Sequence, residues 1–188
     1  LLNSNLKLGR QIEKQNEILE KEIDMAKKVQ MSLLPQKLPE IHNVKVAFKY
    51  EAMMGVGGDF IDIFYKEGSD TLGLFICDVV GHGISAAFLA SMAKMALTNW
   101  NDLVAKPKDA LENLRDLLAD NLGDKFITAC MCSLNVNSGK FTFVNAGHPP
   151  IILVRNNSDI EILKTRGRLI SNFVEPELEI QEITMRKG

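Results

Sequence analysis

The stretch that decides the fold is Val-Gly-Gly-Asp-Phe-Ile-Asp at residues 56–62, followed by Cys-Asp-Val-Val-Gly-His-Gly at residues 77–83. In each motif an aspartate, Asp59 or Asp78, stands at the edge of an apolar, strand-like run and beside glycines. Mg²⁺ and Mn²⁺ prefer oxygen ligands, and glycine lets backbone and water approach such an ion closely. The two motifs therefore predict a metal-dependent hydrolase site in which Asp59 and Asp78 are metal ligands and catalytic residues.

The residues around these motifs predict an α+β fold. Alternating or apolar runs predict strands at residues 44–50, 60–65, 71–77, 126–136, 141–145, 151–154, 160–163 and 178–184. Between the third and fourth of these strands, residues 84–100 and 108–121 have the apolar content and end signals of helices. Because strands precede and follow a pair of helices, we expect antiparallel sheets with helices packed outside them.

Residues 4–34 predict one long helix that precedes this domain. Its apolar residues recur at three- and four-residue steps and form a narrow seam, made of Leu8, Ile12, Leu19, Ile23, Ala26, Val29 and Leu33. A narrow seam favours a coiled coil with a second chain, and hence a homodimer; an amphipathic helix that packs on its own domain is the alternative. Pro35 ends the helix, so we divide the chain into a signalling helix with its linker at residues 1–39 and a domain at residues 40–188.

Composition argues against several classes of partner. The chain has 188 residues, 46% apolar and 24% charged, which suits one ordinary globular domain. A formal net charge of −2 gives no reason to expect nucleic acid or an anionic membrane as a partner, and no apolar run is long enough to span a bilayer. The chain begins at Leu1 and shows no signal peptide, so we expect a cytoplasmic piece of a longer protein.

The three cysteines, Cys77, Cys130 and Cys132, all lie inside apolar strand-like runs. Cys130 and Cys132 have no second cysteine pair and no histidine near them in the sequence, which argues against a zinc site. We expect buried free thiols, as in a reducing compartment.

Four motifs in order give the chain a resemblance to a known family. They are residues 26–35 (Ala-Lys-Lys-Val-Gln-Met-Ser-Leu-Leu-Pro), 56–62, 77–87 and 145–150 (Asn-Ala-Gly-His-Pro-Pro). In sequence and spacing they resemble the metal-dependent protein phosphatases of type 2C, the PPM family, in its SpoIIE-like and RsbU-like bacterial branch. The resemblance covers residues 26–188 and rests on the order of the motifs, since each alone is weak.

The resemblance implies a four-layer α-β-β-α sandwich, two antiparallel sheets flanked by helices. It also implies two Mn²⁺ or Mg²⁺ ions bridged by an aspartate, and hydrolysis of a phosphoserine or phosphothreonine on a regulatory protein such as the antagonist of an anti-sigma factor. An upstream sensor domain is expected as well. By motif match, Asp59, Asp78 and the backbone carbonyl of Val79 are the metal ligands, and Gly58, Asp62 and His82 are second-sphere candidates, although Asp62 should point away from Asp59 on a regular strand.

The chain departs from the family pattern at its C-terminal end. It contains no Thr-Asp-Gly motif, and it ends at Gly188, about where the strand bearing a further aspartate should begin. Either the domain at residues 40–188 is truncated at its C-terminal end and the remaining metal ligands lie beyond Gly188, or this form holds only half a metal site. In both cases we expect weak binding of divalent metal by the two carboxylates alone.

Two other functions compete with this interpretation. A catalytically idle, dimerising signalling module on the same fold fits the missing carboxylates and the long helix. A serine hydrolase is the remote alternative, because residues 83–87 approximate a nucleophile elbow around Ser85 and His148 follows downstream. We expect His148 to be a structural turn residue.

Overall fold

The computed structural model describes residues 2–52, 55–97, 103–156, 158–175 and 177–186. Its elements are α1 (Leu2–Leu33), β1 (Asp59–Tyr65), β2 (Thr71–Val79), α2 (Ile84–Leu97), α3 (Pro107–Leu122), β3 (Ile127–Asn135), β4 (Lys140–Ala146), β5 (Ile151–Val154), β6 (Ile160–Leu163) and β7 (Gln181–Thr184). One antiparallel sheet has the order β1-β2-β3-β4-β7, and β5 and β6 form a second sheet of two strands. The α+β class with antiparallel sheets is confirmed.

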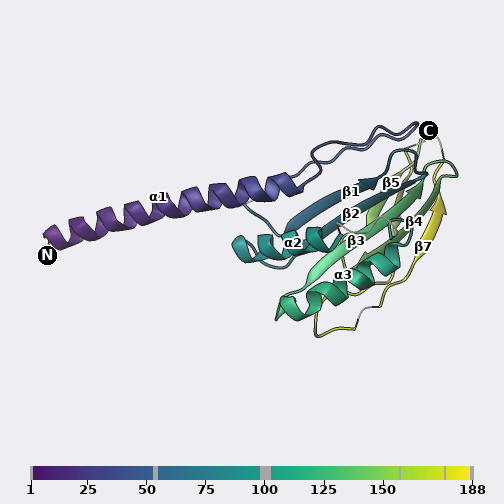
Figure 1. Cartoon of the computed structure of the whole chain (residues 1–188). Helices are drawn as coiled ribbons and strands as arrows, with labels where there is room; N and C mark the ends of the chain where they lie inside the picture. Colours follow the sequence, from purple (N-terminus) through teal and green to yellow (C-terminus); the bar gives the residue numbers. More distant parts are fainter. Residues whose placement is uncertain (1, 53–54, 98–102, 157, 176, 187–188) are drawn as a thin grey trace.

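Helices α2 and α3 cover one face of the five-stranded sheet (Figure 1). On that face Phe60, Phe75 and Met131 are buried to 1% exposure or less and pack against the helices. Helix α2 meets the sheet closely because Ala86, Ala90, Ala93 and other small residues line its buried side. Each buried side chain of this size contributes about 1.5–3 kcal/mol to folding, so this layer holds the sheet in place.

The opposite face of the sheet carries a separate apolar surface. Phe141 and Phe143 stack there with ring centroids 5.6 Å apart, and Leu153 and Leu163 of the β5–β6 sheet join the same cluster. In the described part of the chain no helix contacts β5 or β6, so the fourth, helical layer of the expected sandwich is not among the described residues.

The strand predicted at residues 44–50 is wrong. Within that segment the described backbone forms a bridge only at Val44, to Ile41. Val46, Ala47 and Phe48 instead line a cavity of about 450 Å³ whose other wall includes Ile61 and Leu74. The apolar side chains of this segment therefore lie over a face of the sheet, although its backbone does not form the pairing that a strand requires.

The remaining predicted elements agree with the structure to within a few residues. The largest shift is at the C-terminal strand, expected at residues 178–184 and observed at Gln181–Thr184, with Leu178 forming an isolated bridge to Gly167. The end of the helix predicted at residues 84–100 lies outside the described residues beyond Leu97. Cys77, Cys130 and Cys132 are buried free thiols, as expected.

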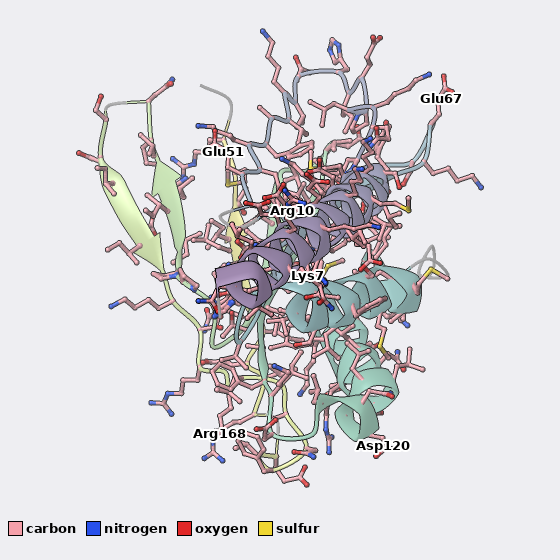
Figure 2. All side chains as sticks on the ribbon, turned by 90° about the vertical axis from the view of Figure 1, so that its left-hand side faces the viewer. Lys7, Arg10, Glu51, Glu67, Asp120 and Arg168 are labelled. Atoms are coloured by element: carbon pink, nitrogen blue, oxygen red, sulfur yellow. The ribbon has the colours of Figure 1, made fainter. Side chains whose placement is uncertain are left out.

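Helix α1 projects from the domain, and its C-terminal part lies beside α2 (Figure 1). Figure 2 looks along it from the N-terminal end, where Lys7 and Arg10 project into solvent. The predicted seam divides in two: Ile23 and Ala26 are partly buried, whereas Leu8, Ile12 and Leu19 are about half exposed, at 58%, 48% and 54%. No helix in the described part of the chain is long and apolar enough to cross a membrane.

An ion pair fastens β1 to α2. The carboxylate of Asp62, 4% exposed, binds the ammonium group of Lys94 and accepts a hydrogen bond of 2.9 Å from the Ile63 amide. Lys94 Nζ also lies 5.9 Å from the centre of the Phe60 ring. Burial makes this carboxylate depend on its partner, because an unpaired charge is costly in an apolar layer.

We predict that Lys94→Met lowers the free energy of unfolding by roughly 2–4 kcal/mol, because it leaves Asp62 buried without its counter-ion. The double variant Asp62→Leu/Lys94→Met should recover most of that loss, since it removes both charges. Urea denaturation of the single and double variants measures both values. Equal losses in the Lys94→Met and double variants would show that the pair has no energetic coupling.

Candidate metal centre

Asp59 and Asp78 face each other across the β1–β2 ladder. The register pairs them directly, at the first position of β1 and the last position but one of β2. Directly paired residues have Cβ atoms about 4.5–5.5 Å apart and project from the same face. Both side chains are exposed, and within the described residues no hydrogen bond or ion pair reaches either carboxylate. Two acidic groups therefore share one small region at the edge of the sheet.

The electrostatics of the site reflect this arrangement. Partial burial, followed by the negative charge of Asp59, raises the pKa of Asp78. Burial and then Asp59 likewise raise the pKa of Tyr50, and burial followed by both aspartates raises that of Cys77. The Tyr50 hydroxyl is buried and has no hydrogen-bond partner among the described residues. A cation between the carboxylates would offset the negative charge of Asp59, which adds to the effect of burial on each of these pKa values.

Beside Asp59 and Asp78, further polar residues form a row that extends onto β3 and the β4–β5 turn. Thr128 is paired with Asp78, and its hydroxyl lies 3.5 Å from the Asp78 carbonyl oxygen and 3.0 Å from Nδ1 of His148. Burial lowers the pKa of His148, and the charge of Asp59 opposes that shift only in part, so the imidazole is neutral near pH 7. His148 therefore belongs to the site, which its turn sequence did not indicate, and Thr128 was not anticipated.

Asn145 fixes the turn that presents His148. Its side-chain oxygen accepts a 2.7 Å hydrogen bond from the His148 amide, and its Nδ2 donates to the carbonyl oxygens of His148 and Pro149 at 2.8 and 3.2 Å. Gly147, with φ of 71°, starts the reversal in a conformation that glycine adopts without strain. The Asn-Ala-Gly-His-Pro-Pro motif thus has a specific structural purpose, the orientation of the imidazole.

Gly58 allows the two motifs to touch. A Cβ atom at this position would clash with the carbonyl oxygen of Val79 and lie 3.3 Å from Cβ of Ala86. The Val79 amide donates a 3.2 Å hydrogen bond to the Gly58 carbonyl, and the Val79 side chain is fully buried. Gly58 therefore holds Asp59 close to the backbone of Val79, the third predicted ligand.

The other sequence-predicted residues lie in different surroundings. Asp62 is on the helix-covered face, opposite to Asp59, and pairs with Lys94. His82 is exposed in the turn between β2 and α2, flanked by Gly81 and Gly83 at φ of 100° and 78°. Ser85 lies in the first turn of α2, and among the described residues no hydrogen bond joins it to His148, whose imidazole contacts Thr128. The geometry does not support a Ser85–His148 catalytic pair.

The residues at this edge suit a hard divalent cation, because two unpaired carboxylates and a nearby backbone carbonyl are all oxygen donors. In the described ranges there is no group of three or more His, Cys, Asp or Glu placed to hold a metal ion. Among the described residues, the oxygen donors at this edge of the sheet are the carboxylates of Asp59 and Asp78 and the backbone carbonyl of Val79.

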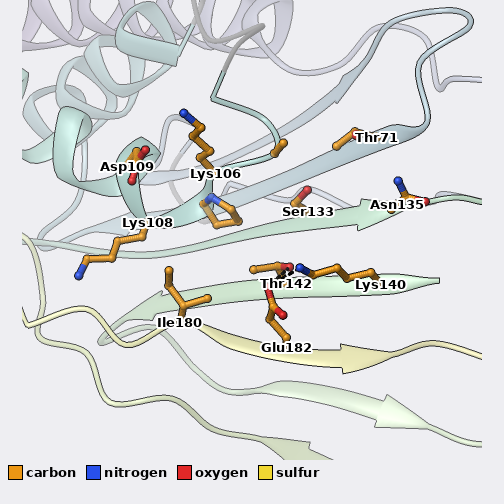
Figure 3. Close-up of a pocket in the computed structure, with 12 residues that line it drawn as sticks. Thr71, Lys106, Lys108, Asp109, Ser133, Asn135, Lys140, Thr142, Ile180 and Glu182 are labelled. Carbon is orange, nitrogen blue, oxygen red and sulfur yellow. Dashed lines mark hydrogen bonds and ion pairs between the residues drawn. The ribbon is translucent and has the colours of Figure 1, made fainter. Parts of the chain in front are cut away.

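A separate polar hollow of about 340 Å³ opens beside the N-terminus of α3 (Figure 3). Lys106 and Lys108 line it from the helix end, and Lys140 and Glu182 line it from the sheet, where they form an ion pair of 2.8 Å. None of the residues that line it belongs to the four motifs. The hollow is distinct from the acidic pair at the edge of the sheet.

The fold is that of a PP2C-type phosphatase domain. The structure of the SiaA-PP2C domain of Pseudomonas aeruginosa matches 92% of this chain and 69% of its own length, with a TM-score of 0.74 and 16% identity. The family model described as stage II sporulation protein E (SpoIIE) matches residues 68–188, a span that contains Asp78 and begins after Asp59. The chain belongs to this SpoIIE family, and the resemblance drawn from the four motifs is confirmed.

Individual relatives agree with this assignment. Phosphoserine phosphatase RsbU of Bacillus subtilis is 31% identical over 133 residues, and the phosphoserine phosphatase RsbP of the same organism is 24% identical over 169 residues. The chain spans about two fifths of each, 39% of RsbU and 41% of RsbP. The structure of the RsbU and RsbW domains of Rv1364c from Mycobacterium tuberculosis is 30% identical, with a TM-score of 0.58 over 67% of this chain and 35% of that one.

We predict that Asp78→Asn raises the melting temperature in metal-free buffer at pH 7 by on the order of 1–2 °C, because it removes repulsion between two facing carboxylates. Adding Mn²⁺ should raise the melting temperature of the wild type and not of the variant. Glu13→Gln is the matched control, since it removes one negative charge from the exposed, projecting part of α1. A metal-free Asp78→Asn protein that melts below the wild type would contradict the repulsion argument.

Proposed function

We propose that the chain is the phosphatase domain of a divalent-metal-dependent protein serine/threonine phosphatase. The observation that carries the proposal is the register pairing of Asp59 with Asp78 on a SpoIIE-family fold. Such a pair gives a concentrated negative charge that attracts Mn²⁺ or Mg²⁺. When bound, two such ions would neutralise the oxygens of a phosphomonoester and lower the pKa of water that attacks phosphorus.

In this proposal the chain's own residues bind the metal ions and orient the phosphoryl group. Asp59 and Asp78 provide anionic oxygens from two strands, and the Val79 carbonyl provides a neutral one. Gly58 keeps the space beside Val79 free of a side chain. The Thr128 hydroxyl and the neutral His148 imidazole continue the row and offer hydrogen-bonding groups to a phosphoryl or leaving serine oxygen.

We propose a phosphorylated regulatory protein as the substrate, such as an anti-sigma-factor antagonist. The names of the relatives RsbU and RsbP support phosphoserine. The exposed side chains of Asp59 and Asp78, at the edge of the sheet, suit a phosphoserine presented on a protein surface. An upstream sensor domain would fit the much greater length of those relatives.

A catalytically idle module is the second candidate. It is favoured by the small donor set, two carboxylates and a carbonyl in the described part of the chain, because two divalent ions normally need more anionic oxygens. Direct measurement of turnover distinguishes the two.

We predict that Asp59→Asn and Asp78→Asn each reduce Mn²⁺-stimulated hydrolysis of a phosphoserine protein by roughly a thousandfold or more, since they remove metal ligands. The assay measures the release of phosphate by a protein that contains this chain together with any residues that natively flank it. Ser85→Ala should retain full activity and serves as the control against a serine hydrolase. Activity in either aspartate variant close to that of the wild type refutes the site; no turnover by the wild type favours the idle module.

We also propose that α1 pairs with its counterpart in a second chain. The support is the half-exposed seam at Leu8, Ile12 and Leu19, which the domain leaves uncovered. Gln15 and Glu22 interrupt the seam, so the dimer should be weak.

Sedimentation should show a dimer at high concentration that dissociates in the variant Leu8→Glu/Ile12→Glu, because charges replace apolar contacts in the seam. These positions lie far from the docked end of α1, so the domain stays folded. Lys14→Glu, outside the seam, is the matched control. A wild-type monomer at every concentration, or a dimer unaffected by the double change, refutes pairing through α1.

A further inference from the structure

A buried serine without a partner lies in the polar hollow beside the N-terminus of α3. Ser133 is 6% exposed, and its side chain projects from β3 into this hollow of about 340 Å³ (Figure 3). Among the described residues no hydrogen bond reaches the Ser133 hydroxyl, whereas the side-chain amide of the nearby Asn135 donates to Asp70 at 2.9 Å. Because buried polar groups are normally paired, the partner of this hydroxyl has to come from the hollow itself.

The end of α3 brings further unpaired donors to the other side of the hollow. Lys106 is the N-cap residue, and its side chain makes no capping hydrogen bond. Pro107, which begins the helix, has no amide hydrogen, and the amides of Lys108 and Asp109 have no acceptor among the described residues. Such a helix end attracts anions, because its free N–H groups and the helix dipole both present positive charge.

The charged side chains around the hollow are positive on balance. Three lysines, Lys106, Lys108 and Lys140, line it together with two acids, Asp109 and Glu182. Glu182 is already paired with Lys140 at 2.8 Å, and Lys106 forms no ion pair in the described part of the chain. Figure 3 shows Lys106 extending away from the sheet, and rotation about its side-chain bonds brings the ammonium group over the hollow. The hollow therefore suits an anion better than water.

We propose that this hollow binds the phosphoryl group of a small molecule. The donors approach from two directions, the end of α3 and the Ser133 hydroxyl, and a tetrahedral phosphoryl group has oxygens that accept from both. A carboxylate offers only two oxygens in one plane. The volume of about 340 Å³ lies at the lower end of the range of small-molecule pockets, so a small ester group fits beside the phosphate.

The hollow is remote from the carboxylate pair at the other end of the sheet. Ser133 follows Thr128, the residue paired with Asp78, by five positions along β3, which corresponds to about 16 Å of strand. An anion bound beside Ser133 is thus too far away to be a ligand or substrate of the proposed metal centre. The inference does not depend on the proposed function.

Titration of the full chain with inorganic phosphate tests the site, and glycerol phosphate is the second probe. EDTA in the buffer prevents binding through a metal ion, and sodium chloride at matched ionic strength controls for screening. We expect saturable shifts of the backbone amide NMR signals of Lys108, Asp109 and Ser133 with phosphate and not with chloride. A lower Kd for glycerol phosphate identifies an ester as the ligand, and a lower Kd for inorganic phosphate identifies the free anion.

Variants separate a built site from general attraction to lysines. Ser133→Ala should raise the Kd for phosphate about tenfold, since it removes a hydrogen bond to a charged group, and Lys106→Ala about threefold. Glu182→Gln should lower the Kd, because it removes a negative charge and frees Lys140. Lys45→Ala, which removes an exposed lysine outside the hollow, is the matched control and should leave the Kd unchanged. Shifts that do not saturate, or an equal Kd in Ser133→Ala and the wild type, overturn the proposal.

Discussion

The register of the β1–β2 hairpin is the constraint on which the site depends. Asp59 faces Asp78 only in the observed pairing, and a slip of one residue would turn one carboxylate toward the helix-covered core. The register is held by the alternation of buried and solvent-facing residues, with Phe60 and Cys77 inward beside the two aspartates. The free energy gained by burying apolar side chains on one face of the hairpin thus offsets the repulsion between the two aspartates on the other face.

The acidic residues on the two faces of β1 have different roles. Asp62 is only three residues from Asp59, yet it is buried and paired with Lys94, while Asp59 has no ion pair among the described residues. A paired, buried carboxylate stabilises the contact between strand and helix, and an exposed, unpaired one remains available to a cation. The difference follows from the two-residue period of the strand, which sends positions 59 and 62 to opposite faces.

Local patterns predicted most of this arrangement, and long-range contacts account for what they missed. Asp59 and Asp78 were identifiable because each motif combines an acid with glycines at a strand edge, and the opposite direction of Asp62 followed from strand period. His148 and Thr128 were not, since their contact joins β3 to a distant turn. The strand expected at residues 44–50 failed for a related reason: periodicity shows which side chains are buried, but not whether an adjacent backbone is present to pair with.

Gln30 is the sharpest case of information that appears only in three dimensions. In the sequence it is one polar residue on a charged helix, beside the apolar seam. In the fold it occupies a place that an apolar residue could fill sterically but not chemically, because the Gly57 amide and carbonyl need partners. A helix that rested on the domain by apolar contact alone could slide with little cost. Two directional hydrogen bonds to the Gly57 backbone instead give α1 a defined position on the domain.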